Sequence, residues 1–155
     1  MWRFIGVLIA LAVIWWWMPT RMSAQSLPLF ENGARAGEQR VGGTCLEGKC
    51  LIVYVAPWCP SCRAAQPMLK ELRRALAEEK IPVSIVAGMD KPPALETYAQ
   101  TLSYPVLLDI DGQLSHSVKI KALPYFIVIN IRGEIVKTVR GAYPDVRSMR
   151  EHLAL

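Results

Sequence analysis

The chain has 155 residues, a hydrophobic fraction of 52% and a formal net charge of +5. This length suits one ordinary domain with its own core plus an appendage. The basic residues are scattered, with Arg73-Arg74 as the one adjacent pair, and aromatic residues do not alternate with them, which excludes a nucleic-acid-binding surface. Four cysteines that are paired in sequence indicate an oxidising compartment.

Residues 4–18, FIGVLIALAVIWWWM, are uncharged and continuously apolar. We expect residues 1–19 to form a signal anchor with one transmembrane helix, whose tryptophans lie at the two membrane interfaces. The alternative is a cleaved signal peptide, although Met22-Ser23-Ala24 fits the small-x-small cleavage rule poorly. The flanking arginines barely decide the orientation, so the cysteine pattern places the folded domain outside a bacterial inner membrane, in the periplasm.

Residues 20–40 are mixed polar and small, without a clear period, and predict a tether that leads into a domain over 41–155. Cys45 and Cys50 flank four residues that include Gly48, which predicts a tight reversal. Cross-strand neighbours in a hairpin are close enough for a disulfide, so we expect a structural disulfide here. Two alternatives stay open, namely a second redox pair and two reduced thiols.

The central stretch runs over residues 51–72, LIVYVAPWCPSCRAAQPMLKEL. Its first five residues are rich in β-branched side chains and predict a strand buried on both faces. We expect a helix to begin at Pro60, since proline is tolerated in a first helical turn, and to continue through Leu76. Cys59 therefore lies at a helix N-terminus.

Cys59 and Cys62 have the spacing of a dithiol switch. Free N–H groups and the helix dipole stabilise an anion at Cys59, which lowers the thiol pKa below the roughly 8.5 of free cysteine. Cys62 lies one helical turn further on, close enough to form a disulfide with Cys59. One metal ion cannot hold all four cysteines, because Cys50 and Cys59 lie at opposite ends of a strand on the order of 16 Å long.

The rest of the chain alternates strand-like and helical patterns. Pro124 lies at the mouth of a strand that a turn joins to the next one, and Asp145 is placed to cap the last helix. This order predicts an α/β layered domain with an antiparallel part. The expected elements are strands at 81–86, 105–109, 123–130 and 135–139, and helices at 94–102 and 146–153.

The strand, the Trp58-Cys59-Pro60-Ser61-Cys62 motif, the helix and Pro67 resemble the active site of the thioredoxin superfamily. The segments YPVLLDIDGQ and LPYFIVINIRGEIVKTVRG are similar to membrane-tethered proteins of the TlpA/ResA type. The resemblance implies a thioredoxin fold, with a central mixed β-sheet flanked by helices, and a cis peptide bond before Pro124.

Members of that family are disulfide reductases outside the inner membrane, and a DsbD/CcdA-type membrane carrier re-reduces them. Their clients include cytochrome c apoproteins and copper-site assembly proteins, and they use no cofactor. The resemblance implies that Cys59 attacks the client disulfide and Cys62 resolves the intermediate. It also implies a client-binding surface formed by Trp58, Pro60, Leu123 and Pro124.

The chain departs from the family at two positions. Ala65 stands where such proteins often carry glutamate, and Val53 corresponds to the buried aspartate of ordinary thioredoxins. Neither residue can take the proton of Cys62. Three other functions stay open at this point: a disulfide oxidase or isomerase of the same fold, a copper metallochaperone with Cys59 and Cys62 as soft ligands, and an interaction domain whose cysteines are inert.

Overall fold

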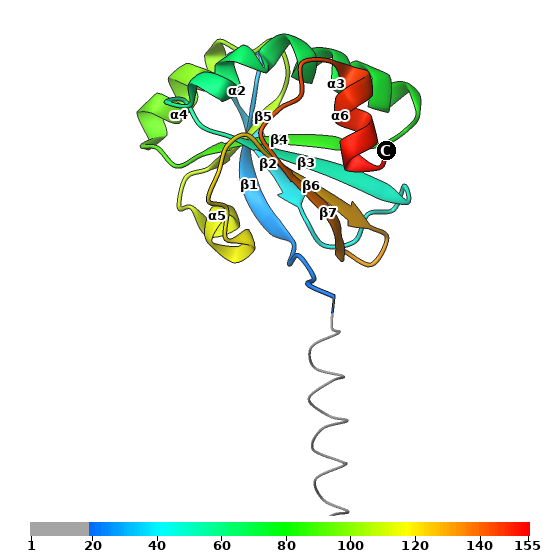
Figure 1. Ribbon diagram of the computed structural model, residues 1–155. Coiled ribbons are helices and arrows are strands. Elements are labelled where there is room, and N and C mark those ends of the chain that lie inside the picture. The colour runs from blue at the N-terminus through cyan, green and yellow to red at the C-terminus, as the bar shows by residue number, and fades with distance from the viewer. Residues whose placement is uncertain (1–18) are drawn as a thin grey trace, which may run out of the picture.

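A seven-stranded mixed β-sheet carries helices on both faces in the computed structural model, which describes residues 19–155 (Figure 1). The predicted anchor covers residues 1–19, of which residues 1–18 lie outside the described part of the chain. None of the described helices has the length and apolar character needed to cross a membrane. The strands are β1 (Gln25–Glu31), β2 (Ala34–Val41), β3 (Lys49–Val55), β4 (Val83–Gly88), β5 (Val106–Asp109), β6 (Tyr125–Asn130) and β7 (Ile135–Arg140). The helices are α2 (Pro60–Ala64), α3 (Gln66–Glu78), α4 (Pro92–Gln100), α5 (Gln113–Val118) and α6 (Val146–Leu153).

The strand order is β2-β1-β5-β4-β3-β6-β7, so β3 lies inside the sheet with a partner on each side. It pairs in parallel with β4 and antiparallel with β6. Both parallel connections, β3 to β4 and β4 to β5, run through helices, as parallel pairing requires. The strands predicted after residue 50 and the helices predicted at 94–102 and 146–153 are therefore confirmed, and the α/β layered class with them.

Alternate side chains of β3 enter two different cores, because successive residues of a strand point to opposite faces. Leu51, Val53 and Val55 belong to the core beneath α3, α4 and α6. Ile52 and Tyr54 belong to the second core, on the face that α5 covers. Burial of both faces explains why this strand reads as a continuous apolar run in the sequence.

The tether predicted over residues 20–40 is wrong, because residues 25–31 and 34–41 form β1 and β2 at one edge of the sheet. A register shift between Pro28 and Phe30 breaks the two-residue period of β1, so its buried residues Leu27 and Phe30 are three positions apart. Strand β2 is exposed at every residue but the last and carries no apolar pattern. The signals that normally reveal a strand are absent from both.

The single helix predicted from Pro60 to Leu76 is in fact two helices, α2 and α3, which meet at Ala65. Pro67 has no N–H group and cannot donate to the carbonyl of Arg63 four residues earlier, which favours the break between the two helices. Pro67 is well placed in the first turn of the new helix α3.

Helix α5 was not apparent from the sequence, and a buried carboxylate holds it in place. Asp109, only 1% exposed, accepts hydrogen bonds from the backbone N–H groups of Leu114 (3.1 Å) and Ser115 (3.0 Å) at the start of α5. Tyr54 donates a third from its hydroxyl at 2.7 Å. Burial raises the pKa of Tyr54, so the phenol remains a donor. Gly88 leaves room for that phenol, since a Cβ there would overlap its oxygen.

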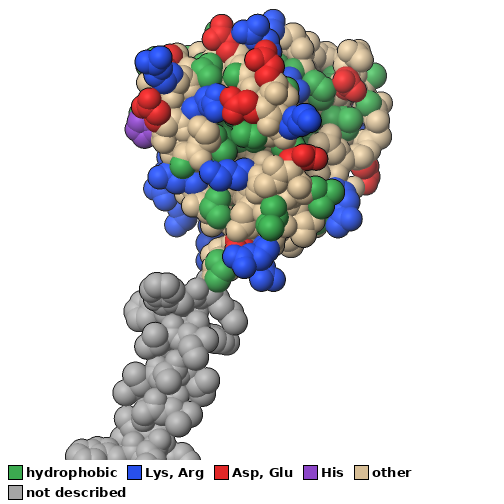
Figure 2. Space-filling view, turned by 90° about the vertical axis from the view of Figure 1, so that its right-hand side faces the viewer, with side chains coloured by type: hydrophobic (Ala, Val, Ile, Leu, Met, Phe, Trp, Pro, Cys, Tyr) green, Lys and Arg blue, Asp and Glu red, His purple; other side chains and the backbone are tan. Residues whose placement is uncertain are grey.

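Charged side chains of both signs are interspersed on the face of the protein shown in Figure 2.

One buried carboxylate ties the turn between β6 and β7 to the start of the described chain. Glu134 accepts from Asn130 Nδ2 at 2.8 Å and pairs with Arg132 at 2.8 Å and Arg21 at 3.6 Å. The hydrogen bond from Asn130 and the two guanidinium groups lower the pKa of Glu134 below its ordinary value of 4.5.

This lowered pKa predicts a pH-dependent effect of Glu134→Gln on stability. The carboxylate stabilises the folded state above its unfolded pKa, and this contribution is lost as the pH falls through the lower folded pKa. We expect Glu134→Gln to lower the urea midpoint at pH 7, and the difference from the wild type to shrink at about pH 3. A difference that stays constant across this range would contradict the assignment.

Candidate active site

The two cysteines of the Cys59-Cys62 motif lie just beyond the carboxyl end of β3. This strand ends at Val55, and Cys59 N donates to the carbonyl of Ala56 at 3.2 Å, which turns the chain sharply into α2. Because β6 runs antiparallel to β3 with Tyr54 opposite Tyr125, the residues before β6 lie beside the same end of β3. The sheet thus brings Pro124 to the motif from 65 residues further along the chain.

Cys59 is the N-cap of α2, as the sequence predicted. Its Sγ accepts a hydrogen bond from the backbone N–H of Cys62 at 3.1 Å. The two residues form a disulfide with their Cα atoms 5.3 Å apart. Cys59 retains 4% exposure and Cys62 has none, so Cys59 carries the sulfur that a partner can approach.

The surroundings of the buried Cys62 are apolar. Val53 and Ala65, the two positions where the sequence departs from the expected family pattern, are both buried and belong with Cys62 to the same hydrophobic core. The structure therefore brings no carboxylate to Cys62 from either position. Among residues 19–155 no cluster of three or more His, Cys, Asp or Glu side chains has a metal-binding arrangement.

Trp58 stands at the surface beside the motif, with 55% of its area exposed. Its indole N–H donates to the carbonyl of Met89 at 2.9 Å, at the residue that follows β4. Met89 has a positive φ of 58°, which orients this carbonyl away from the strand direction. The ring is thus held in place from the neighbouring strand, a contact that the sequence did not reveal.

The peptide bond between Leu123 and Pro124 is cis, which confirms the prediction for this position. Pro124 is buried, and its carbonyl accepts from Gly141 N at 2.8 Å, so this carbonyl is occupied within the fold. The backbone groups of Leu123 have no hydrogen-bond partner within residues 19–155. Of the predicted client-binding set, Pro60 and Trp58 are exposed and Leu123 is half-buried.

Cys45 and Cys50 form a disulfide, with Cα atoms 5.8 Å apart. They do not close a hairpin, because the strands on either side, β2 and β3, are not neighbours in the sheet. Cys45 is buried at 1% exposure in the second core, and Cys50 is near the start of β3. Since Cys59 follows the other end of that strand, the two disulfides are separated by the length of β3, roughly 20 Å.

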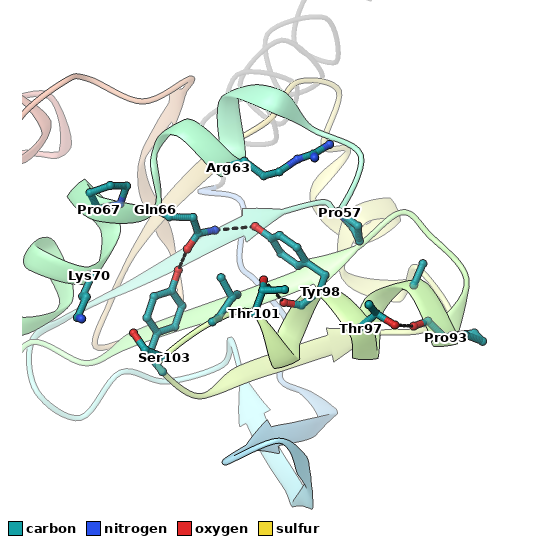
Figure 3. Close-up of a pocket in the computed structure, with 13 residues that line it drawn as sticks. Pro57, Arg63, Gln66, Pro67, Lys70, Pro93, Thr97, Tyr98, Thr101 and Ser103 are labelled. Carbon is teal, nitrogen blue, oxygen red and sulfur yellow. Dashed lines mark hydrogen bonds between the residues drawn. The ribbon is translucent and has the colours of Figure 1, made fainter.

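A cavity of about 670 Å³ opens beside the motif, between the start of α3 and helix α4 (Figure 3). Pro57 and Arg63, which bracket Trp58 and the two cysteines, form the wall on the motif side. The cavity was not predicted, because α4 contributes to it from about 30 residues further along the chain and no local pattern marks the contact.

A family model described as Redoxin matches residues 23–153. The chain belongs to the Redoxin family. Two relatives of this redoxin are similar over part of their length. The thiol-disulfide oxidoreductase ResA of Halalkalibacterium halodurans is 28% identical over 127 residues, which cover 72% of this chain and 72% of that protein. The sporulation thiol-disulfide oxidoreductase A of Bacillus subtilis is 26% identical over 98 residues, which cover 60% of this chain and 59% of that protein.

Solved structures share the fold at lower sequence identity. StoA from Bacillus subtilis has a TM-score of 0.60 at 22% identity, covering 81% of this redoxin and 96% of that chain. A structure from Chlorobium tepidum, described as a putative thiol:disulfide interchange protein DsbE, has a TM-score of 0.67 at 17% identity. The match covers 88% of this redoxin and 94% of that chain. Together with the family match, these findings confirm a thioredoxin-like α/β fold of the TlpA/ResA type.

The N-cap geometry predicts an acidic Cys59 thiol in the reduced protein. The backbone N–H of residue 62 stabilises the thiolate, and Cys62→Ser keeps this group while it prevents disulfide formation. In a Cys45→Ser/Cys50→Ser background, we expect Cys62→Ser to be alkylated by iodoacetamide with an apparent pKa well below about 8.5. Cys59→Ser in the same background is the control for slow alkylation of the buried Cys62. An apparent pKa at or above that of free cysteine would refute the prediction.

Proposed function

We propose that the protein is an extracytoplasmic thiol-disulfide oxidoreductase that reduces disulfides of client proteins. The observation that carries this proposal is the Cys59-Cys62 disulfide at the start of α2, with the more accessible sulfur at the N-cap and Pro124 beside it. The ResA relative, which matches 72% of this chain, is named a thiol-disulfide oxidoreductase, and this name supports the proposal.

The reaction exchanges one disulfide for another in two steps. The Cys59 thiolate attacks one sulfur of the client disulfide, forms a mixed disulfide and releases the second client sulfur as a thiolate. Cys62 then loses its proton, attacks Cys59 Sγ and displaces the first client sulfur. The client gains two electrons and leaves as two thiolates, which take up protons from water, and the enzyme ends with the Cys59-Cys62 disulfide.

We assign water as the acceptor of the Cys62 proton, because Val53 and Ala65 supply no carboxylate. Trp58 shields one side of the mixed disulfide from solvent, since its ring is held by Met89. The free backbone groups of Leu123 hydrogen-bond the client main chain, and the exposed Pro60 provides apolar contact.

We place the enzyme on a bacterial inner membrane, with residues 1–19 as a single-pass anchor and the thioredoxin-like domain in the periplasm. The apolar run at 4–18 and the two disulfides of the domain support this location. A DsbD/CcdA-type membrane protein supplies the two electrons that reset Cys59-Cys62. Clients in cytochrome c or metal-site maturation fit this location.

Cys45-Cys50 is assigned a structural role. The length of β3 separates it from Cys59-Cys62, so the two pairs within one chain cannot exchange directly. The disulfide fastens the loop before β3 to the second core, where Cys45 is buried. Its exposed neighbour Leu46 takes no part in either core.

Insulin reduction in the presence of dithiothreitol tests the activity. We expect Cys59→Ala to reduce the rate to the uncatalysed background, because no other sulfur at the site is accessible. Pre-reduced Cys62→Ser that has been freed of dithiothreitol should accumulate a mixed disulfide with insulin, which non-reducing electrophoresis detects. Cys45→Ser/Cys50→Ser is the matched control and should keep the wild-type rate. Full activity of Cys59→Ala would overturn the proposed function.

The equilibrium potential of Cys59-Cys62 tests the direction of electron flow. We expect a value near or below roughly −230 mV, in the range of reducing thioredoxins and glutaredoxins. The same value is expected in the Cys45→Ser/Cys50→Ser protein, since that disulfide lies at the far end of β3. A potential near about −120 mV would identify an oxidase instead.

A further inference from the structure

The cavity between α3 and α4 begins where the reactive motif ends. Arg63 follows Cys62 directly and lines the cavity, and Pro57 lines it from the other side of the motif. A polypeptide whose cysteine is bonded to Cys59 therefore passes within a few residues of this opening, at about 3.3 Å per residue. Its volume of about 670 Å³ is that of a site for a few side chains.

The floor of the cavity is held rigid by one side-chain amide. Gln66 donates from Nε2 to the hydroxyl of Tyr98 at 2.6 Å, and its Oε1 accepts from the hydroxyl of Tyr104 (Figure 3). Burial raises the pKa of both phenols, so they stay neutral. The guanidinium of Arg73 lies 5.0 Å from the centroid of the Tyr104 ring and supports it. The floor is thus an ordered aromatic surface.

The charged groups at the cavity have one sign. Arg63 and Lys70 line it, and no Asp or Glu does. Neither cation forms a salt bridge within residues 19–155, whereas four other arginines of this part of the chain do. An aromatic and apolar floor beneath unpaired cations is complementary to a segment that carries an apolar and an acidic side chain.

We propose that this cavity binds the client segment next to its disulfide and selects segments that carry an acidic residue beside an apolar one. The proposal rests on the proposed function, since it names the substrate class of the same site. The cations steer and orient the acidic residue, the tyrosine floor takes the apolar side chain, and the client cysteine is thereby presented to Cys59.

Two disulfide-bonded peptides, identical except for Glu or Lys three residues from the cysteine, test the selection with the full chain in non-ionic detergent. We expect the reduced wild-type protein to react about tenfold faster with the acidic peptide at low salt, and the ratio to fall at high salt. Lys70→Glu should abolish or invert this ratio. Lys80→Glu makes the same charge change at an exposed residue outside the cavity and should leave the ratio intact.

Binding is measured separately from chemistry with the acidic peptide in which serine replaces cysteine. It should compete with the acidic disulfide peptide for wild-type protein, and compete more weakly for Lys70→Glu. An equal rate with both peptides, or an equal effect of Lys70→Glu and Lys80→Glu, would overturn the proposal.

Bis(2-hydroxyethyl) disulfide, a neutral compound too small to span the cavity, separates failure of the proposed selection from failure of the proposed function. If the wild type reduces this compound but shows no preference between the two peptides, the proposed selection alone fails. If the wild type reduces neither this compound nor the two peptides, the proposed function fails as well.

Discussion

Strand β3 is hydrogen-bonded on both sides and buried on both faces, and the position of the active site depends on this constraint. A strand so held cannot shift its register without exposing apolar side chains of two cores. Its carboxyl end therefore presents Cys59 at a defined point, at the N-cap of α2. The neighbouring strands β4 and β6 deliver Met89 and Pro124 to the same point, so the site is assembled by strand order.

The two ends of β3 hold disulfides in different environments. At the amino end, Cys45 is almost fully buried in the core and fastens a connecting loop. At the carboxyl end, the Cys59 sulfur is held by a backbone N–H group at a helix start, an arrangement that favours a thiolate. In our proposal the same bond serves structure at one end and chemistry at the other, because the surroundings of the sulfur differ.

The chemistry of the site is set by apolar neighbours. Val53 and Ala65 supply no carboxylate to the thiolate, and in our proposal the proton of Cys62 leaves through solvent. Charge is instead placed outside the sulfur pair, on Arg63 and Lys70 at the cavity beside it. In our proposal these cations act on the client and not on the cysteines, so recognition and proton transfer are separated in space.

The sequence alone determined the features that depend on local pattern. The strand at 51–55, the position of Cys59 at a helix start and the cap at Asp145 follow from apolar runs, proline placement and capping chemistry, and the structure confirms each. The cis bond before Pro124 followed from a family resemblance and is also confirmed. In each case the physical signal lies within a few residues of the feature.

Only the tertiary structure decided the features whose causes are distant in the chain. Strand β2 has no buried face and the period of β1 is broken by a bulge. The apolar pattern of the sequence therefore does not predict these two strands, and only the fold reveals their pairing. Helix α5 depends on the buried Asp109, and the contact of Trp58 with Met89 depends on the order of the strands. The cavity beside the motif needs α3 and α4 side by side. These arrangements are set by packing between segments, which a local pattern in one segment does not encode.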